Sequence, residues 1–191
     1  MKVFVVDNYD SFTYNLVHIL RYRDIEHTVA RNDKFDLDEL EAYSHIMLSP
    51  GPGIPEEAGL MPQVIQRYGA SKNILGVCLG HQAIAEAYGA QLYNLDEVQH
   101  GLAASCYPIE DDGLFKNLSK PFKVGRYHSW AVKADSFTDN VPLQITAQSE
   151  DGCVMALRHT SFNVRGVQFH PESILTEYGQ EMIKNWLLYC D

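Results

Sequence analysis

Short apolar runs alternate along the first half of the chain with longer stretches in which apolar residues recur at helical spacing. The short runs are rich in Val, Ile and Leu and end at Gly, Pro or Asn, which is typical of buried strands. The longer stretches carry one apolar face, which is typical of amphipathic helices. The alternation predicts strands at 2–6, 26–30, 45–48 and 74–77, helices at 12–22, 61–68 and 81–88, and a helical turn at 36–41.

The second half of the chain, from Gln91 onward, has shorter apolar runs. Strands that alternate with helices form parallel sheets covered by helices. We therefore predict an α/β fold with an open, mostly parallel sheet flanked by helices and additional antiparallel strands in the C-terminal half. Because no repeat, low-complexity segment or Gly/Ser/Pro-rich linker marks a boundary, 1–191 is predicted to be a single domain. The predicted later elements are antiparallel strands at 102–107, 143–147, 154–157 and 164–169 and a helix at 177–189.

Composition and charge narrow the function classes. Of 191 residues, 46% are hydrophobic and 21% charged, which provides a large core and argues against disorder. Lys and Arg number 15 against 25 Asp and Glu, for a formal net charge of -10, and no basic run is present. Nucleic acid is therefore not an expected partner. The first apolar stretch is too short for a signal peptide and no segment is long enough to span a bilayer, so a cytoplasmic location is expected.

The cysteines and histidines show no metal-ligand spacing. Neither a C-x-x-C pair nor an H-x-x-x-H pair occurs, so no metal site is predicted. In a cytosolic chain, an unpaired cysteine is usually a small buried hydrophobe, and this is the starting interpretation of all four. These are Cys78, Cys106, Cys153 and Cys190.

One cysteine lies at a predicted strand-to-helix junction with glycines on both sides. Gly76-Val77-Cys78-Leu79-Gly80 has the form of a nucleophile elbow, in which the glycines allow close approach of neighbouring chain around a sharp turn. The N-terminus of the following helix favours thiolate over thiol. Taken alone, the motif fits a nucleophile and a merely packed cysteine about equally well.

A thiol nucleophile needs a base, and His170-Pro171-Glu172 offers one beside the predicted strand 164–169. An imidazole accepts and returns the proton of the thiol, and a carboxylate orients the imidazole. In an extended chain, residues two apart project to the same face, so Glu172 is expected beside His170. A histidine at the end of a strand is more often structural, and the base role depends on its pairing with Cys78.

Ser49-Pro50-Gly51-Pro52-Gly53 follows the predicted strand 45–48, at the edge where open α/β sheets bind ligands. Its glycines can present backbone amides, and amides aimed at a developing oxyanion stabilise a tetrahedral intermediate. The amide of Leu79 is a second candidate donor. The same sequence is also typical of an ordinary Pro/Gly turn.

Taken together, the motifs resemble a known family. The loop 49–53, Cys78-Leu79-Gly80-His81-Gln82 and His170-Pro171-Glu172-Ser173 are similar, in type and in order, to the class I (triad) glutamine amidotransferases. Asp7-Asn8-Tyr9-Asp10-Ser11-Phe12-Thr13 and Arg126-Tyr127-His128-Ser129 resemble the branch that serves chorismate-using synthases. That branch comprises anthranilate synthase component II and the glutaminase subunit of para-aminobenzoate (aminodeoxychorismate) synthase. The match extends from end to end of the chain and is specific.

The resemblance implies the class I glutamine amidotransferase fold, which is flavodoxin-like, and a glutaminase that hydrolyses L-glutamine to glutamate through a glutamyl thioester. Cys78 is the implied nucleophile, His170 the group that protonates the leaving ammonia, and Glu172 the carboxylate that orients His170. The implied oxyanion region contains Gly51 and the Leu79 amide. The residues implied to bind glutamine are Gly51, Pro52, Gly53, Gln82, Ser129 and Trp130, the last two through backbone groups.

The resemblance also implies a partner, a separate larger synthase subunit that binds chorismate and receives ammonia directly. That subunit is expected to need Mg²⁺, whereas no cofactor is expected in this chain, and neither nucleic acid nor a membrane is an expected partner. Anthranilate, for tryptophan biosynthesis, is the favoured product, and aminodeoxychorismate, for folate biosynthesis, or both products stay open. The loop from Asn8 to Phe12 is a candidate docking site for the partner.

Two positions depart from the family pattern. Trp130 stands where leucine is more common, which puts the width of the pocket in doubt but not a contact made through the backbone. Leu102 follows His100-Gly101 where the family commonly has lysine, which puts in doubt any partner or effector contact of that charge.

Two other classes of protein stay open as alternatives. A noncatalytic flavodoxin-like interaction module is disfavoured by the intact Cys78, His170 and Glu172. A peptidase-like thiol hydrolase requires an open cleft, and nothing in the sequence favours peptides over glutamine. His81 and His128 are alternative bases in principle, but both are assigned supporting roles, because His81 begins the elbow helix and is expected to point away from Cys78.

Overall fold

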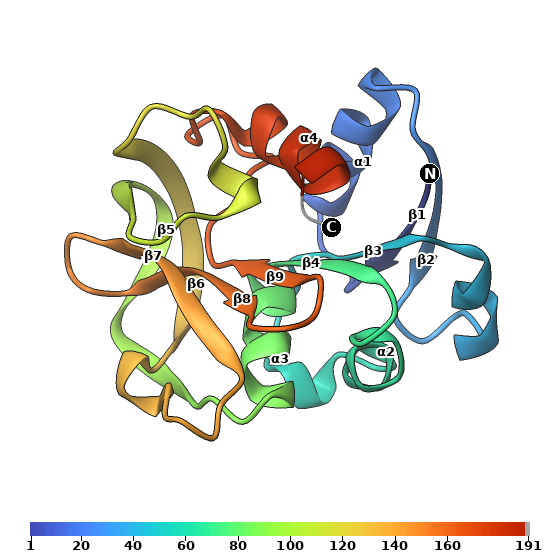
Figure 1. The fold of residues 1–191 in the computed structure, drawn as a ribbon, viewed down its shortest axis with the longest axis horizontal. Coiled ribbons are helices and arrows are strands. Elements are labelled where there is room, and N and C mark those ends of the chain that lie inside the picture. The colour runs from blue at the N-terminus through green and yellow to red at the C-terminus, as the bar shows by residue number, and fades with distance from the viewer. Residues whose placement is uncertain (190–191) are drawn as a thin grey trace.

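The computed structural model describes residues 1–189, and its strands form a single curled sheet (Figure 1). Its strand order is β2-β1-β3-β4-β9-β8-β7-β5-β6. In chain order the strands are β1 (Lys2–Asp7), β2 (Glu26–Arg31), β3 (His45–Leu48), β4 (Asn73–Val77), β5 (Leu92–Pro108), β6 (Phe122–Val132), β7 (Leu143–Ser149), β8 (Val154–His159) and β9 (Val164–Val167). The helices are α1 (Thr13–Tyr22), α2 (Met61–Tyr68), α3 (Leu79–Ala87) and α4 (Gly179–Tyr189), with short 3-10 helices at Leu37–Ala42, Pro55–Glu57, Gly113–Phe115 and Ala134–Ser136.

The predicted α/β fold is confirmed, and the parallel part of the sheet comprises β2, β1, β3, β4 and β9. The strands β8, β7, β5 and β6 extend the sheet with antiparallel pairing. The prediction of an antiparallel strand at 164–169 was only partly right. This segment pairs in parallel with β4 as well as antiparallel with β8, and the strand ends at Val167, where the chain turns toward the candidate site.

Successive residues of the parallel strands pack alternately into two hydrophobic cores, one on each face of the sheet. Val3 and Val5 of β1 pack with α1 and α4, whereas Phe4 and Val6 pack with α2 and α3. Figure 1 shows the corresponding layers, with α1 and α4 on one face of the sheet and α2 and α3 on the other. A strand buried on both faces reads as a continuous apolar run, and this explains why β1, β3 and β4 were predictable from the sequence.

The topology brings the candidate motifs together. The strands β1, β3, β4 and β9 are parallel, so the segments that follow their carboxyl ends lie at the same edge of the sheet. These segments begin at Asn8, Ser49, Cys78 and Gln168.

Among the described residues, no helix combines the length and the apolar character that crossing a membrane requires.

Candidate active site

Cys78 occupies a strained turn between β4 and α3. Its backbone has φ 52° and ψ -99°, a backbone conformation that residues other than glycine rarely adopt outside functional sites. A Cβ atom at Gly76 would lie 2.4 Å from the carbonyl of Gly80, and one at Gly80 would lie 2.5 Å from the Leu48 oxygen. The glycines on either side of the cysteine are therefore required by close backbone packing, as the elbow motif predicts.

Cys78 is 6% exposed, and its side chain has a polar neighbour that the sequence motifs did not indicate. The amide nitrogen of Gln168 donates a hydrogen bond to the Cys78 sulfur at 3.6 Å. Gln168 is fully buried and lies two residues before His170. A polar residue inside an otherwise apolar run, Val167-Gln168-Phe169, was the available signal for it.

His170 and Glu172 form a buried pair. The imidazole Nδ1 lies 2.7 Å from a carboxylate oxygen of Glu172, and the two side chains are 3% and 0% exposed. The prediction that these residues meet is confirmed, but not through an extended chain. Residues 171–175 form turns, and the Ser173 amide donates to the His170 carbonyl at 3.1 Å, so the chain folds back at Pro171.

The surroundings of His170 favour its protonated form. Burial alone lowers the pKa of His170, but its interactions with the Cys78 thiol and with Glu172 outweigh burial and raise the pKa to about 10. Nε2 is buried, and no hydrogen-bond partner meets it at ordinary geometry. The rings of Phe12 and Tyr127 contact the imidazole edge-on, with centroids 5.4 and 5.0 Å away. These contacts hold the ring in one orientation.

A cavity of about 200 Å³ opens at Cys78. Gly51, Pro52, Gly53, Gln82, Ser129 and Trp130, the six residues that the resemblance implies for glutamine, all line it. The remaining lining residues are Val98, Gln99, His100, Tyr127 and His128. A cavity of this volume suits a ligand of amino-acid size.

The loop 49–53 is fixed against the elbow. A Cβ atom at Gly51 would lie 2.6 Å from the Asn8 Cβ and 2.7 Å from a methyl carbon of Leu79, so only glycine allows this approach. Asn8 anchors the loop because its side-chain amide donates to the Ser49 carbonyl at 2.8 Å and its backbone amide donates to the Ser49 hydroxyl at 2.9 Å. The structure thus brings both implied oxyanion residues, Gly51 and Leu79, together beside Cys78.

Gln82 and the two supporting histidines lie around this cavity. The side-chain amide of Gln82 donates to the Trp130 carbonyl at 2.8 Å and to the Gln168 side chain at 3.2 Å. Burial lowers the pKa of His81 to about 3, and the ring packs against Gly166 of β9. Burial is also the largest cause that lowers the pKa of His128, to about 4. Both histidines are therefore neutral at pH 7, unlike His170.

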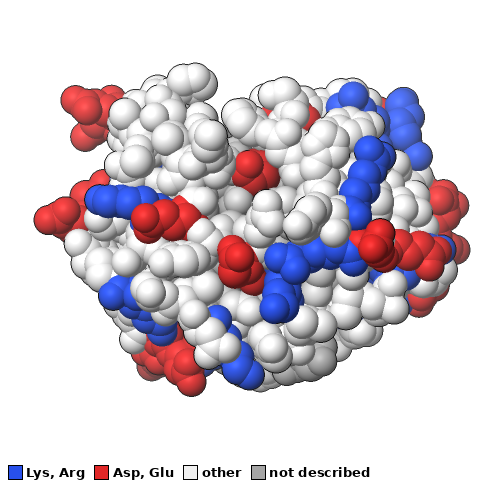
Figure 2. Space-filling view, turned by 90° about the horizontal axis from the view of Figure 1, so that it is seen from above, with Lys and Arg blue, Asp and Glu red and all other residues white. Residues whose placement is uncertain are grey.

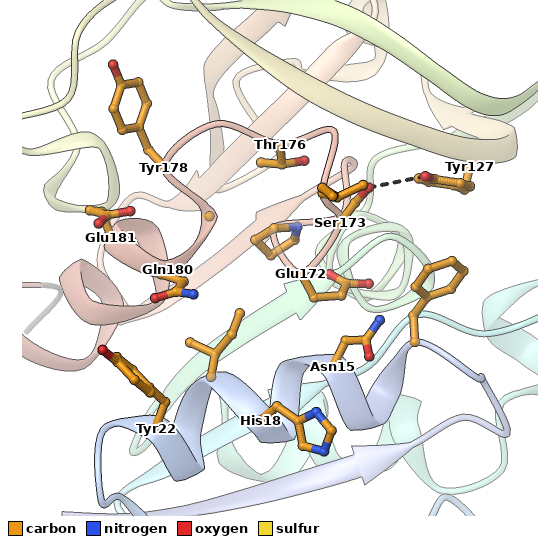
Figure 3. Close-up of a pocket in the computed structure, with 15 residues that line it drawn as sticks. Asn15, His18, Tyr22, Tyr127, Glu172, Ser173, Thr176, Tyr178, Gln180 and Glu181 are labelled. Carbon is orange, nitrogen blue, oxygen red and sulfur yellow. Dashed lines mark hydrogen bonds between the residues drawn. The ribbon is translucent and has the colours of Figure 1, made fainter.

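A larger groove, about 830 Å³, shares Tyr127 with the small cavity and reaches Glu172. Figure 3 shows it between α1, which carries Asn15 and Tyr22, and the segment 171–181. Tyr127 and Ser173 are joined across one end by a hydrogen bond of 3.1 Å between their oxygens. Seen from the side of α1 and α4, the surface is hollowed, and acidic and basic residues are interspersed without a large basic patch (Figure 2).

The remaining cysteines differ from Cys78. Cys106 and Cys153 are buried, and burial raises the pKa of both thiols, that of Cys153 to about 11. The interpretation of these two as packed hydrophobes is confirmed, and Cys190 lies outside the described residues. Within residues 1–189, no group of His, Cys, Asp and Glu side chains is arranged to hold a metal ion.

Comparison with known proteins agrees with this geometry. The family model described as glutamine amidotransferase class-I matches residues 4–190. The chain belongs to the class I glutamine amidotransferases. It is therefore an amidotransferase enzyme, and it shares the family fold with a protein of Thermoplasma acidophilum described as a candidate subunit of GMP synthase. Their TM-score is 0.88 at 25% identity, over 100% of this chain and 94% of that one.

Several curated relatives are similar over nearly their full length. Anthranilate synthase component 2 of Thermus thermophilus is 47% identical, over 98% of this chain and 92% of the relative. Anthranilate synthase component 2 of Pseudomonas aeruginosa is 44% identical, over 96% and 93%. A Bacillus subtilis relative named aminodeoxychorismate/anthranilate synthase component 2 is 42% identical, over 97% and 95%. All three are named as component 2 of anthranilate synthase, and the Bacillus subtilis name also includes aminodeoxychorismate synthase.

Proposed function

We propose that this chain is the glutaminase subunit of anthranilate synthase, which hydrolyses L-glutamine and delivers ammonia to a larger, chorismate-binding subunit. The observation that carries the proposal is the arrangement of Cys78, His170 and Glu172 beside a cavity of about 200 Å³. The names of the relatives from Thermus thermophilus and Pseudomonas aeruginosa support the pathway.

The Cys78 sulfur attacks the side-chain amide carbon of glutamine. His170 accepts the proton of the Cys78 thiol, and its raised pKa favours the imidazolium that results, so the sulfur attacks as a thiolate. Attack forms a carbon–sulfur bond and moves the carbonyl π electrons onto oxygen. Backbone amides at Gly51 and Leu79 stabilise that oxyanion.

Collapse of the tetrahedral intermediate releases ammonia. His170 donates its proton to the leaving nitrogen, the carbon–nitrogen bond breaks, and a glutamyl thioester remains on Cys78. His170 then takes a proton from water as the water oxygen attacks the thioester, and glutamate leaves as the thiolate is restored. Glu172 accepts the hydrogen bond from Nδ1 and keeps Nε2 directed to these proton transfers.

The cavity holds the rest of the substrate. Ser129 and Trp130 lie on the last part of β6, where backbone groups can bind the α-amino and α-carboxylate ends of glutamine. Gln82 contacts the substrate from α3, and its amide nitrogen is already held by the Trp130 carbonyl. Pro52 and Gly53 complete the side of the cavity that faces the oxyanion loop.

The partner docks on the face that contains the loop from Asn8 to Phe12 and the groove beside it. Phe12 contacts the His170 ring and also lines the groove, so this loop links the surface to the triad. Tyr9 on the same loop is 52% exposed, and Ile174, at the rim of the groove, is 99% exposed. Exposed apolar side chains around a hollow are typical of interaction surfaces.

Reconstitution tests the proposal. The chain is mixed separately with two large subunits from the same cell, that of anthranilate synthase and that of aminodeoxychorismate synthase, each with chorismate, glutamine and the Mg²⁺ proposed for the partner. Anthranilate as the only product supports the proposal, and aminodeoxychorismate as the only product refutes the pathway assignment. In both mixtures the Cys78→Ala variant should form no glutamate while it still binds the partner, and undiminished glutamate formation would refute the mechanism.

A subunit shared by both synthases is the second candidate. The dual name of the Bacillus subtilis relative favours it. Formation of both products, each at the expense of glutamine, would support the shared role.

A further inference from the structure

A buried arginine stands two residues before His128 on β6. Arg126 is 4% exposed, and a buried guanidinium is strongly destabilising unless its N–H groups are paired. Its Nη1 donates to a carboxylate oxygen of Asp151 at 3.0 Å, and the other oxygen of Asp151 accepts from the Ser149 hydroxyl. Its Nε donates to Nε2 of His128 at 3.2 Å. Arg126 thus joins a partly exposed carboxylate to a histidine on the wall of the candidate glutamine cavity.

This contact determines where the proton of His128 lies. A guanidinium has donors only, so the Nε2 atom that receives its hydrogen bond must present a lone pair. In the neutral imidazole, Nδ1 then carries the proton, and Nδ1 lies 2.8 Å from the Trp130 carbonyl, to which it donates. Protonation of Nε2 would remove the acceptor for Arg126. The low pKa of His128 agrees with this neutral form, with Arg126, Asp151 and His170 as the charged groups around it.

The Trp130 carbonyl is also the acceptor for Gln82. It therefore receives one hydrogen bond from His128 and one from the Gln82 amide, both at 2.8 Å. The same Gln82 nitrogen contacts Gln168, which donates to the Cys78 sulfur. A continuous series of hydrogen bonds thus connects Arg126 with the wall of the cavity and with the nucleophile.

We propose that Arg126 is a positioning residue for glutamine binding, because its Nε–H holds His128 in the Nδ1–H tautomer that fixes the Trp130 carbonyl. The inference rests on the proposed function, which assigns Ser129 and Trp130 to the α-amino and α-carboxylate end of the substrate. Without the Nε donor, the His128 ring is free to rotate or to be protonated, and the backbone at Trp130 loses its fixed position. Binding of the remote end of glutamine is then weakened more than the chemical step.

Two variants separate the Nε donor from the charge. In Arg126→Gln, the amide nitrogen is bonded to Cδ, as Nε is in arginine, so an N–H remains for His128. In Arg126→Met, a methyl carbon replaces that nitrogen, and both variants lose the ion pair with Asp151 equally. In the complex with the large subunit, we expect Arg126→Met to raise KM for glutamine about 10-fold with kcat within about 3-fold of wild type. Arg126→Gln should keep both constants within about 3-fold of wild type.

A merely structural role for Arg126 would impair the two variants alike, and that result, or an unchanged KM in Arg126→Met, overturns the inference. If Arg126→Met does not fold, the ring nitrogen chemical shifts of His128 in the ¹⁵N-labelled wild-type chain decide the question. The Nδ1–H tautomer near pH 7 is expected, and the Nε2–H tautomer or a charged ring overturns the inference. Failure of the proposed function would look different, because wild-type chain and large subunit together would then form no glutamate.

Discussion

Replacing Gly51 with alanine tests the oxyanion assignment, because this position has no room for a Cβ atom. The added carbon would lie 2.6 Å from the Asn8 Cβ and 2.7 Å from a Leu79 methyl carbon. Nonbonded carbon atoms normally lie about 3.5–4.0 Å apart, so the loop and the elbow must separate by about 1 Å. Asn8 is held by two hydrogen bonds to Ser49, and the movement will therefore displace the Gly51 backbone itself.

The expected effect on catalysis is large. A displacement of about 1 Å in a catalytic arrangement lowers the rate about 10²-fold, and loss of one oxyanion donor lowers kcat about 10²–10³-fold. We therefore expect Gly51→Ala to lower kcat for glutamate formation about 10²-fold. KM for glutamine should change less, since Ser129, Trp130 and Gln82 are not displaced.

The assay measures glutamate formation in the complex with the large subunit, at saturating glutamine. Gly152→Ala is the matched control, since Gly152 has φ +78° but no atom lies within 4 Å of the Cβ position. Its positive φ should lower stability by about 1 kcal/mol without an effect on kcat. A folded Gly51→Ala variant that retains more than a third of wild-type kcat would refute the assignment of Gly51 to the oxyanion region.

Three further predictions concern buried polar groups and the half-buried ring of Phe12. Gln168→Leu removes the donor to the Cys78 sulfur and should lower kcat about 10-fold in the same assay, with a normal kcat as the contrary result. The pKa values of His81 and His128 are lowered in the folded chain, so as pH falls below 6.5 these histidines are protonated in the unfolded chain before they are protonated in the folded one. The stability of the folded chain therefore decreases from pH 6.5 toward 4. Urea unfolding measures the free energy of unfolding at pH 7.5 and at pH 5. The decrease between these two pH values should be smaller for His81→Gln than for wild type by about 2 kcal/mol, and an equal decrease would contradict this. Phe12→Ala removes an edge contact with His170 and should lower kcat several-fold with the chain still folded, whereas an unchanged kcat would show that the ring does not need this support.

The parallel half of the fold was predictable because each central strand is apolar on both faces. Residues 45–48 and 74–77 are continuous apolar runs or nearly so, and both strands were predicted within one residue of their bounds. The strand β6 was not predicted, since Arg126, Tyr127 and His128 interrupt its apolar pattern. Those polar residues face the cavity and its supporting network. The residues that interrupt the apolar pattern of the strand are therefore the ones that belong to the site.

Most of the long strand β5 was also not predicted, in this case because it is exposed to solvent. Only its part at 102–107 was predicted, because most of Leu92–Pro108 is exposed or half-buried and lacks a continuous apolar face. Its pairing with β6 is what holds it in place, and that pairing involves residues distant in sequence.

The motif residues were predictable, and their geometry was only partly so. The elbow required glycines at 76 and 80, and the structure gives the steric reason for both. The contact between His170 and Glu172 was expected from an extended chain, whereas a turn produces it. Gln168 and Arg126 could not be assigned from the sequence, because their roles depend on hydrogen bonds to residues far along the chain.

The central claim is that Cys78 carries the glutamyl group during turnover, and its most direct test is capture of that intermediate. The chain in complex with chorismate and the large subunit is mixed with glutamine, quenched rapidly in acid, digested and analysed by mass spectrometry. The account predicts one glutamyl group, on the peptide that contains Cys78, and none in the Cys78→Ala variant. A turning-over wild-type complex with no acyl group on Cys78, or with the group on another residue, would contradict it.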